Sequence, residues 1–254
     1  MRRLLPGVIG LALLCCGVAV AQQKEPIVLA LHADMSSGSA LAGEAIRRGA
    51  LLAISEINAQ GGLLGGRKLE LVVRDHHGVP ARATEQLPEL AGMPHLVAIL
   101  SGLHSPPVIQ NLGFIHEHQL IILSPWAAAT GVVHHELRPN YTFRVSVDDA
   151  RVGEFLVAQA LARGHGRLAL ILEKTAWGRS NDHDAVWLFA LAIQKAKSTE
   201  RARVRDALER LGPYQGLVRT YQPAFTPSNH EALSSSDFKL ATFNPRGVQV
   251  PAQP

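Results

Sequence analysis

Short apolar segments alternate with segments of helical period through the first half of the chain. The apolar runs have the length of buried strands, and the segments between them carry apolar residues at helical spacing. The predicted strands are 27–32, 68–74, 96–100 and 120–123, and the predicted helices are 43–59, 80–90 and 106–117. Strands joined by helices of this length form a parallel sheet, because a parallel pair needs a long crossover. The sequence therefore predicts an α/β fold with a doubly wound parallel sheet.

The alternation continues for one more unit and then stops. In chain order, the pattern predicts a strand at 141–147, a helix at 149–163, a strand at 168–173, two successive helices at 184–197 and 199–211, and weak strands at 216–221 and 238–243. The second of the two successive helices is expected to begin at a cap on Ser198 or Thr199.

The N-terminal segment has the layout of a secretory signal peptide. Arg2 and Arg3 form a short cationic start, an apolar run follows at 4–20, and Ala19 and Ala21 provide a small-residue cleavage site. A membrane anchor is the alternative, but proline and glycine residues weaken a helix that is already short for spanning. We expect this segment to be removed and the mature protein to be periplasmic.

Both cysteines, Cys15 and Cys16, fall inside that segment. A mature chain without cysteine has no disulfide, no thiolate nucleophile and no cysteine-based metal site. The formal net charge is only +4, and no block rich in lysine and arginine occurs, which argues against a nucleic-acid partner. With 47% hydrophobic residues, the chain can bury a core of its own.

Five segments, taken in order, match one known family. They are ADMSSGSALAGEAIRRGALLAISEINAQGG (33–62), LSGLHSPPVI (100–109), LSPWAAATG (123–131), PNYTFRVSVDD (139–149) and LILEKTAWGRSN (170–181). These segments resemble the leucine/isoleucine/valine-type substrate-binding proteins of bacterial ABC transporters. The resemblance implies a type I periplasmic-binding fold, in which two α/β lobes joined by crossing strands close on a ligand.

The resemblance also implies a missing part. Members of that family carry further strand–helix units where this chain passes from Asn181 to His183, and those units form most of the second lobe. The chain is therefore expected to have a nearly complete first lobe and a truncated second lobe. The expected domains are a signal peptide at 1–21, the first lobe at 24–145, a remnant of the second lobe at 146–181, and C-terminal helices and strands at 182–254 that return to the first lobe.

A ligand site is expected at the carboxyl edge of the sheet. Right-handed crossovers place the loops after parallel strands at one edge, and ligands bind there in such folds. Ser105 offers a hydroxyl near a predicted helix start, where free N–H groups favour an anion, although a helix cap is the alternative reading. The resemblance assigns this loop, which includes the adjoining His104, to the charged backbone atoms of a ligand.

The neighbouring exit loop adds further candidates. Ala127 and Ala128 are small enough for a ligand to approach the backbone, and Thr130 offers a hydroxyl, with ordinary helix-entry chemistry as the alternative. Trp177 resembles the aromatic position that reaches in from the second lobe of the family, and a packing role is its alternative. The candidate ligand-binding residues are Ser37, His104, Ser105, Trp126, Ala127, Ala128, Thr130 and Trp177.

Neither a metal site nor an active site is expected. The adjacent histidines at 76–77 and 134–135 point apart on a helix or strand, so each pair is a poor chelate. The glycine-rich run at 61–66 follows a helix and precedes a strand, whereas a phosphate-binding loop joins a strand to a helix. No Gly-x-Ser-x-Gly elbow occurs, and Asp75 has no evident partner acid or base. No cofactor is predicted.

We therefore predict an exported solute-binding protein that is not an enzyme. The resemblance implies the substrate-binding component of a branched-chain amino acid-type ABC transporter, which closes around a small amino acid or amide and delivers it to an inner-membrane permease. Two alternatives stay open. One is a truncated remnant that is non-functional or depends on a partner, and the other is a sensory or scaffold module of the same fold.

Overall fold

A five-stranded sheet forms the centre of the molecule. The computed structural model describes residues 24–164, 179–217, 219–234, 237, 241–243 and 249–251. The strand order is β2-β1-β3-β4-β5, and neighbouring strands pair in parallel throughout. The strands are β1 (Ile27–Ala33), β2 (Leu69–Asp75), β3 (Leu96–Ser101), β4 (Ile121–Ser124) and β5 (Thr142–Arg144).

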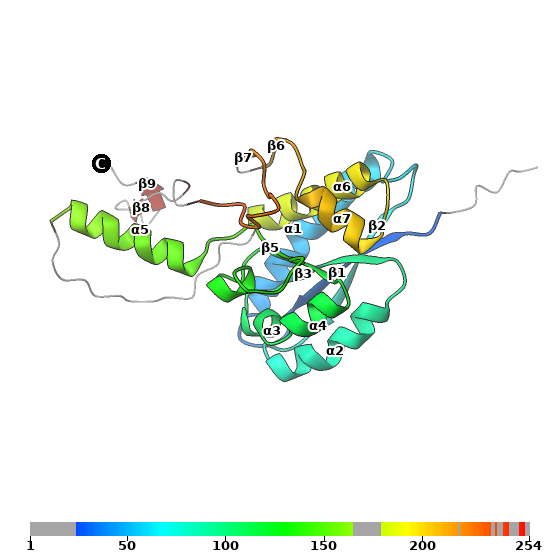
Figure 1. Ribbon diagram of the computed structural model, residues 1–254, viewed down its shortest axis with the longest axis horizontal. Helices are drawn as coiled ribbons and strands as arrows, with labels where there is room; N and C mark the ends of the chain where they lie inside the picture. Colours follow the sequence, from blue (N-terminus) through cyan, green and yellow to red (C-terminus); the bar gives the residue numbers. More distant parts are fainter. Residues whose placement is uncertain are drawn as a thin grey trace, which may run out of the picture.

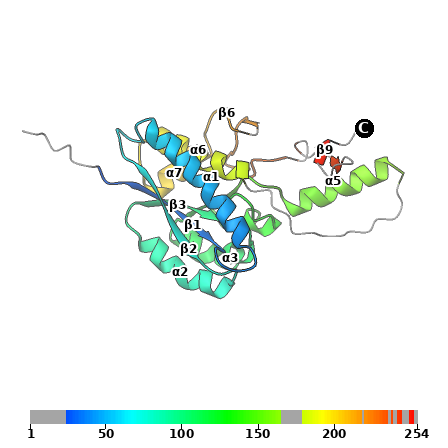
Figure 2. The ribbon, with the colours of Figure 1, turned by 180° about the vertical axis from the view of Figure 1, so that it is seen from behind.

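Helices cover both faces of this sheet (Figure 1, Figure 2). On one face α6 packs along α1, and α7 contacts both α6 and β3, whereas α2, α3 and α4 lie on the opposite face. These helices are α1 (Ala40–Ala59), α2 (Pro80–Gly92), α3 (Pro106–Ile109), α4 (Leu112–Glu117), α6 (Arg179–Ala196) and α7 (Arg201–Leu208). The predicted doubly wound parallel sheet is confirmed.

The core follows from the apolar runs of the central strands. β1, β3 and β4 are buried along their whole length, as parallel strands covered on both faces should be. On the edge strand β2, Leu69 is buried, Glu70 is exposed and the other residues are half-buried. On α6, Phe189 and Ile193 are fully buried in the same core. Helices far along the chain therefore supply part of the cover for the N-terminal sheet.

The segment at 106–117, which was expected to be one helix, forms the two short helices α3 and α4. Asn111 lies between them, and its backbone N–H bonds to Val108 O, three residues back. Its side-chain amide donates to Pro107 O at 2.8 Å. A side chain that bonds the preceding turn competes with regular helix hydrogen bonding, which explains the break.

The second C-terminal helix begins later than expected. α7 starts after Glu200, and Glu200 makes no side-chain cap hydrogen bond. The predicted cap on Ser198 or Thr199 is therefore wrong. Ser198 Oγ instead accepts from the backbone N–H of Glu200 at 3.0 Å, which stabilises the turn before the helix.

Both weak C-terminal strands belong to antiparallel hairpins. The segment at 216–221 contains the turn and the second strand of one hairpin, in which Gly216 N donates to Arg219 O at 2.8 Å. The segment at 238–243 contributes the first strand of the other hairpin. The strands are β6 (Tyr214–Gln215), β7 (Thr220–Tyr221), β8 (Ala241–Phe243) and β9 (Gln249–Pro251).

Helix α5 (Asp149–Ala162) projects away from the sheet (Figure 1). Asp148 caps it, because its carboxylate accepts from the backbone N–H groups of Ala150 and Arg151. None of its residues is buried, and Leu161 is 64% exposed. The strand predicted to follow, at 168–173, lies outside the described residues.

Among the described residues, no helix combines the length and the apolar character needed to cross a bilayer.

Candidate ligand-binding site

The loops that leave the carboxyl edge of the sheet hold most of the candidate residues. Ser37 follows β1, His104 and Ser105 follow β3, and the segment 126–130 follows β4. Trp177 lies outside the described residues.

Asp34 shapes the first of these loops. It is 2% exposed, and its carboxylate accepts from Ser37 N at 2.8 Å, from Ser39 N at 2.9 Å and from Ser37 Oγ at 2.6 Å. Burial acts to raise the pKa of Asp34, but the hydrogen bonds from Ser37, Ser39 and Ser36 outweigh it and lower the pKa from 3.8 to about 2. The hydroxyl of Ser37 is thus committed to the fold of the loop. The sequence signal that we missed is an aspartate followed by serines, which favours a side-chain turn.

Ser105 joins two exit loops. It makes no side-chain cap hydrogen bond to α3, so the capping alternative is wrong. Its Oγ instead accepts from the backbone N–H of Ala129 at 3.1 Å. A hydroxyl that accepts one hydrogen bond keeps its proton for another acceptor. Ser105 is half-buried and can offer that proton at the edge of the sheet.

In the loop after β4, the later residues are more exposed than the earlier ones. Trp126 is 7% exposed and Ala127 is fully buried, and both side chains belong to the hydrophobic core. Ala128 and Thr130 are half-buried, and Thr130 Oγ1 donates to Asp148 Oδ1 at 3.2 Å. Ala128 and Thr130 are thus partly exposed, whereas the Trp126 ring has little surface left for a ligand.

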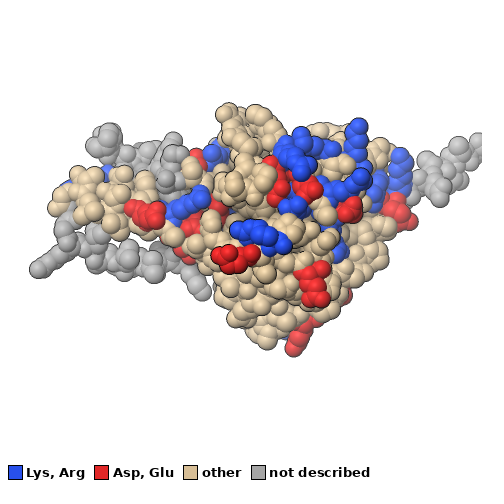
Figure 3. All heavy atoms as spheres, viewed as in Figure 1, with Lys and Arg blue, Asp and Glu red and all other residues tan. Residues whose placement is uncertain are grey.

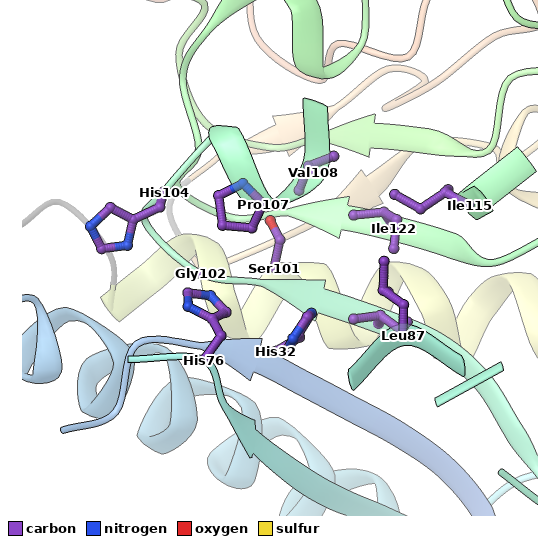
Figure 4. A pocket seen from close by; sticks show the side chains of 11 residues that line it. His32, His76, Leu87, Ser101, Gly102, His104, Pro107, Val108, Ile115 and Ile122 are labelled. Atoms are coloured by element: carbon purple, nitrogen blue, oxygen red, sulfur yellow. The ribbon is translucent and has the colours of Figure 1, made fainter. Parts of the chain in front are cut away.

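Three histidines, together with Ser101, line one small pocket (Figure 4). His32 comes from β1, His76 from the loop after β2 and His104 from the loop after β3. The ring centroids of His32 and His76 are 5.0 Å apart, and those of His76 and His104 are 6.2 Å apart. His104 Nδ1 is buried and has no hydrogen-bond partner among the described residues. Sequence reasoning singled out His104 but missed His32, which lies inside an apolar strand.

These histidines line a small cavity between the sheet and the helices α2, α3 and α4. Its volume of about 10 Å³ has room for about one water molecule. An amino acid is far larger than this cavity.

Burial keeps the inner histidine neutral. His32 is 7% exposed, and its Nε2 lies 3.0 Å from Gln86 Oε1. Burial, followed by the nearby His76, lowers the pKa of His32 from 6.5 to about 4. Burial also lowers the pKa of His76. Charging either ring inside the fold is therefore costly.

Lowering the pH from 6.5 to 5 is expected to reduce the free energy of unfolding by about 1 to 2 kcal/mol through His32. The folded-state pKa is depressed, so the unfolded chain binds more protons in this window and stability falls as the pH falls toward 4. Urea denaturation at several pH values measures this. His32→Gln keeps an N–H donor for Gln86 and should flatten the dependence, whereas the exposed His118→Gln should not. An equally steep dependence in H32Q would contradict the assignment.

A second cluster contains possible metal ligands. His134, Asp148 and Glu231 bring one ligand atom each to within 4.8 Å of one another. Sequence reasoning placed His134 only in a poor histidine chelate and missed this arrangement. Both carboxylates, however, accept hydrogen bonds from the buried guanidinium of Arg144. Because all four carboxylate oxygens already accept hydrogen bonds, from this guanidinium or from backbone N–H groups, we assign no metal to the cluster.

Basic side chains gather over the α6–α7 end of the molecule, with acidic ones among them (Figure 3). On α7, Arg201 donates to the backbone oxygens of Leu96, His118 and Ala91. Arg205 pairs with Glu209 at 2.8 Å. These cations are thus used within the fold and do not form a surface of a single charge.

Comparison with known proteins agrees with this architecture. A family model described as "Periplasmic binding protein" matches residues 26–187. No curated protein matches the chain. Among solved structures, a type 1 periplasmic binding protein from Bordetella pertussis is 14% identical with a TM-score of 0.73, and the match covers 90% of this chain and 100% of that chain.

Two further structures were solved with ligands. The LivJ substrate-binding protein from Streptococcus pneumoniae, in complex with isoleucine, is 15% identical with a TM-score of 0.57, and the match covers 78% of this chain and 92% of that one. An ABC transporter substrate-binding protein from Desulfitobacterium hafniense, in complex with Leu, is 15% identical with a TM-score of 0.60 and coverages of 89% and 95%. At these identities the likeness shows the fold, and the family match extends over more than half of the chain. The chain belongs to the periplasmic binding protein family and has its type I fold.

Proposed function

We propose that this chain binds the α-carboxylate of a small amino acid at the carboxyl edge of its sheet. The observation that carries the proposal is the hydrogen bond from Ala129 N to Ser105 Oγ, which joins the loops after β3 and β4. It leaves the Ser105 hydroxyl proton for an acceptor at the edge. Ala129 N is already bonded to Ser105, so the donors that would join that proton are the N–H groups of Ala128 and Thr130 on either side, and carboxylates favour such groups of donors.

The ligands of the two solved relatives support an aliphatic amino acid as the first ligand to test. One is bound to isoleucine and the other to Leu. In this proposal the chain is exported by residues 1–21 and delivers its ligand to an ABC permease in the inner membrane. Closure would use the part of the second lobe that the chain retains, including Trp177.

Calorimetric titration of the chain from residue 22 onward tests the ligand class. Leucine, isoleucine and valine are the first ligands, and leucinamide, which lacks the carboxylate, is the matched comparison. A site that recognises the carboxylate should bind leucine at least about tenfold more tightly than leucinamide, since a hydrogen bond to a charged group contributes about 1.5 to 3 kcal/mol. Equal binding of both would favour an amide ligand. Absence of heat with every amino acid would favour the non-functional remnant.

Ser105→Ala is expected to weaken leucine binding by about tenfold or more, because it removes the proposed donor to the carboxylate. The unfolding midpoint should change little, since the substitution removes one half-buried hydroxyl. Ser198→Ala is the matched control, because that serine lies before α7 and away from the carboxyl-edge loops. Equal affinities for S105A and S198A would remove Ser105 from the site.

A further inference from the structure

Arg144 is the largest side chain that is completely buried in the described part of the chain. Its Nε donates to Glu231 Oε2 at 2.8 Å, and its Nη2 donates to Glu231 and to Asp148. Its Nη1 donates to Ala129 O at 2.8 Å and to Ala127 O at 3.4 Å. A guanidinium has five N–H donors, and here these contacts use all five.

The acceptors come from three separate segments. The loop at 126–130 follows β4, Asp148 begins α5, and Glu231 lies in the segment that precedes β8. The backbone of Arg144 adds to the same junction, because its N–H donates to His230 O at 3.0 Å and its carbonyl accepts from Ala232 N at 2.9 Å. One residue therefore holds three stretches of chain together.

This junction lies where α5 and the segment after Glu231 leave the body of the sheet. Beyond Asp148 the chain leaves the body of the sheet as α5, and beyond Glu231 it leads toward β8 and β9, beside α5 (Figure 1, Figure 2). Both segments thus leave the first lobe next to Arg144. A movement of α5, or of the segment after Glu231, relative to the sheet therefore acts on this junction.

The same guanidinium holds the proposed ligand loop. Arg144 binds the carbonyls on either side of Ala128, and the Ala128 carbonyl itself accepts from Asp149 N at 3.0 Å. The Ala128 carbonyl and Ala129 N belong to one trans peptide, so they point in opposite directions. Because the carbonyl points toward Asp149 N, the Ala129 N–H points toward Ser105 Oγ. The placement of the Ser105 hydroxyl therefore depends on Arg144 through one intervening peptide.

We propose that Arg144 is a positioning residue, which fixes the ligand loop at 126–130 and ties it to both segments that leave the first lobe. Ligand binding at Ser105 and the orientation of α5 and the segment after Glu231 are then coupled through this side chain. The coupling to a ligand rests on the function proposed above, whereas the control of the loop does not.

Hydrogen exchange of the ligand-free protein tests the control of the loop. Arg144→Lys keeps the charge but loses the planar fork that binds two carboxylates and two carbonyls together. The amide of Ala129 should then exchange at least about tenfold faster. Leu69→Ala is the matched control, because it also empties a buried site but lies on β2, at the opposite edge of the sheet. An Ala129 amide that speeds up no more in R144K than in L69A would overturn the proposal.

Titration with leucine is the second part of this test. R144K should lose at least about tenfold in affinity, whereas L69A should retain wild-type affinity once both are measured below their unfolding transitions. If the wild type binds no amino acid, the proposed function fails, and the exchange result alone still decides the role of Arg144. If R144K does not fold, Glu231→Gln takes its place, since it keeps the shape and removes one of the charges that orient the guanidinium.

Discussion

Replacing Arg144 with methionine is expected to lower the free energy of unfolding by about 3 to 5 kcal/mol. Asp148 and Glu231 are 2% and 3% exposed, so the substitution leaves two buried carboxylates without their cation. The carbonyls of Ala127 and Ala129 lose their donor as well. Urea denaturation followed by circular dichroism measures the change.

A second substitution separates the cost of a stranded charge from the loss of packing. The double variant Arg144→Met with Glu231→Leu should be more stable than the single variant by at least about 1 kcal/mol, because a buried carboxylate is removed together with its partner. Asp148 retains its backbone donors in both variants. If the stability losses of the single variants Arg144→Met and Glu231→Leu simply add in the double variant, the pair does not interact and the assignment of this cluster is wrong.

Phe143→Ala is expected to destabilise the protein by about 3 to 5 kcal/mol, the range for removing a fully buried aromatic ring. The ring lies on the edge strand β5, where it meets Phe225 edge-on at 5.0 Å and stacks on His230 at 3.9 Å. Both partners belong to the C-terminal part of the chain. The loss of stability therefore includes the packing of Phe225 and His230 against β5.

A double-mutant cycle shows whether this contact forms. Phe143→Ala and Phe225→Ala should couple by about 0.5 to 1.5 kcal/mol, the range for an aromatic pair. Phe143→Ala and Leu69→Ala should instead be additive, since β5 and β2 are the two edges of the sheet. No coupling between the two phenylalanines would mean that the C-terminal segment does not pack on β5.

The central sheet was predictable because its strands carry their own signal. Residues 27–32, 96–100 and 120–123 are apolar apart from His32, and the structure makes strands of all three segments. The break between α3 and α4 was not predictable from periodicity. It depends on one amide side chain, that of Asn111, reaching back to the preceding turn.

The position of the candidate site was predictable from the sequence, but its hydrogen-bond partners were not. The order of strands and helices locates Ser105 at the carboxyl edge, yet its partner Ala129 lies 24 residues away in another loop. Sequence reasoning did not single out Arg144, although a charge that is buried within a strand needs a buried partner. That partner, Glu231, is 87 residues distant, and no local pattern connects the two. Contacts of this kind are set by the fold as a whole.

The most direct test of the account is an amide chemical-shift titration of the isotope-labelled chain with leucine. The account predicts shifts concentrated at residues 102–105 and 127–131, which flank the Ser105–Ala129 hydrogen bond, and their loss in Ser105→Ala. Amides on α7 should stay in place, because that helix packs at the opposite end of the strands, where Arg201 donates to Leu96 O at the start of β3. No shift at millimolar leucine, or shifts gathered outside the two loops, would contradict a ligand site at this edge.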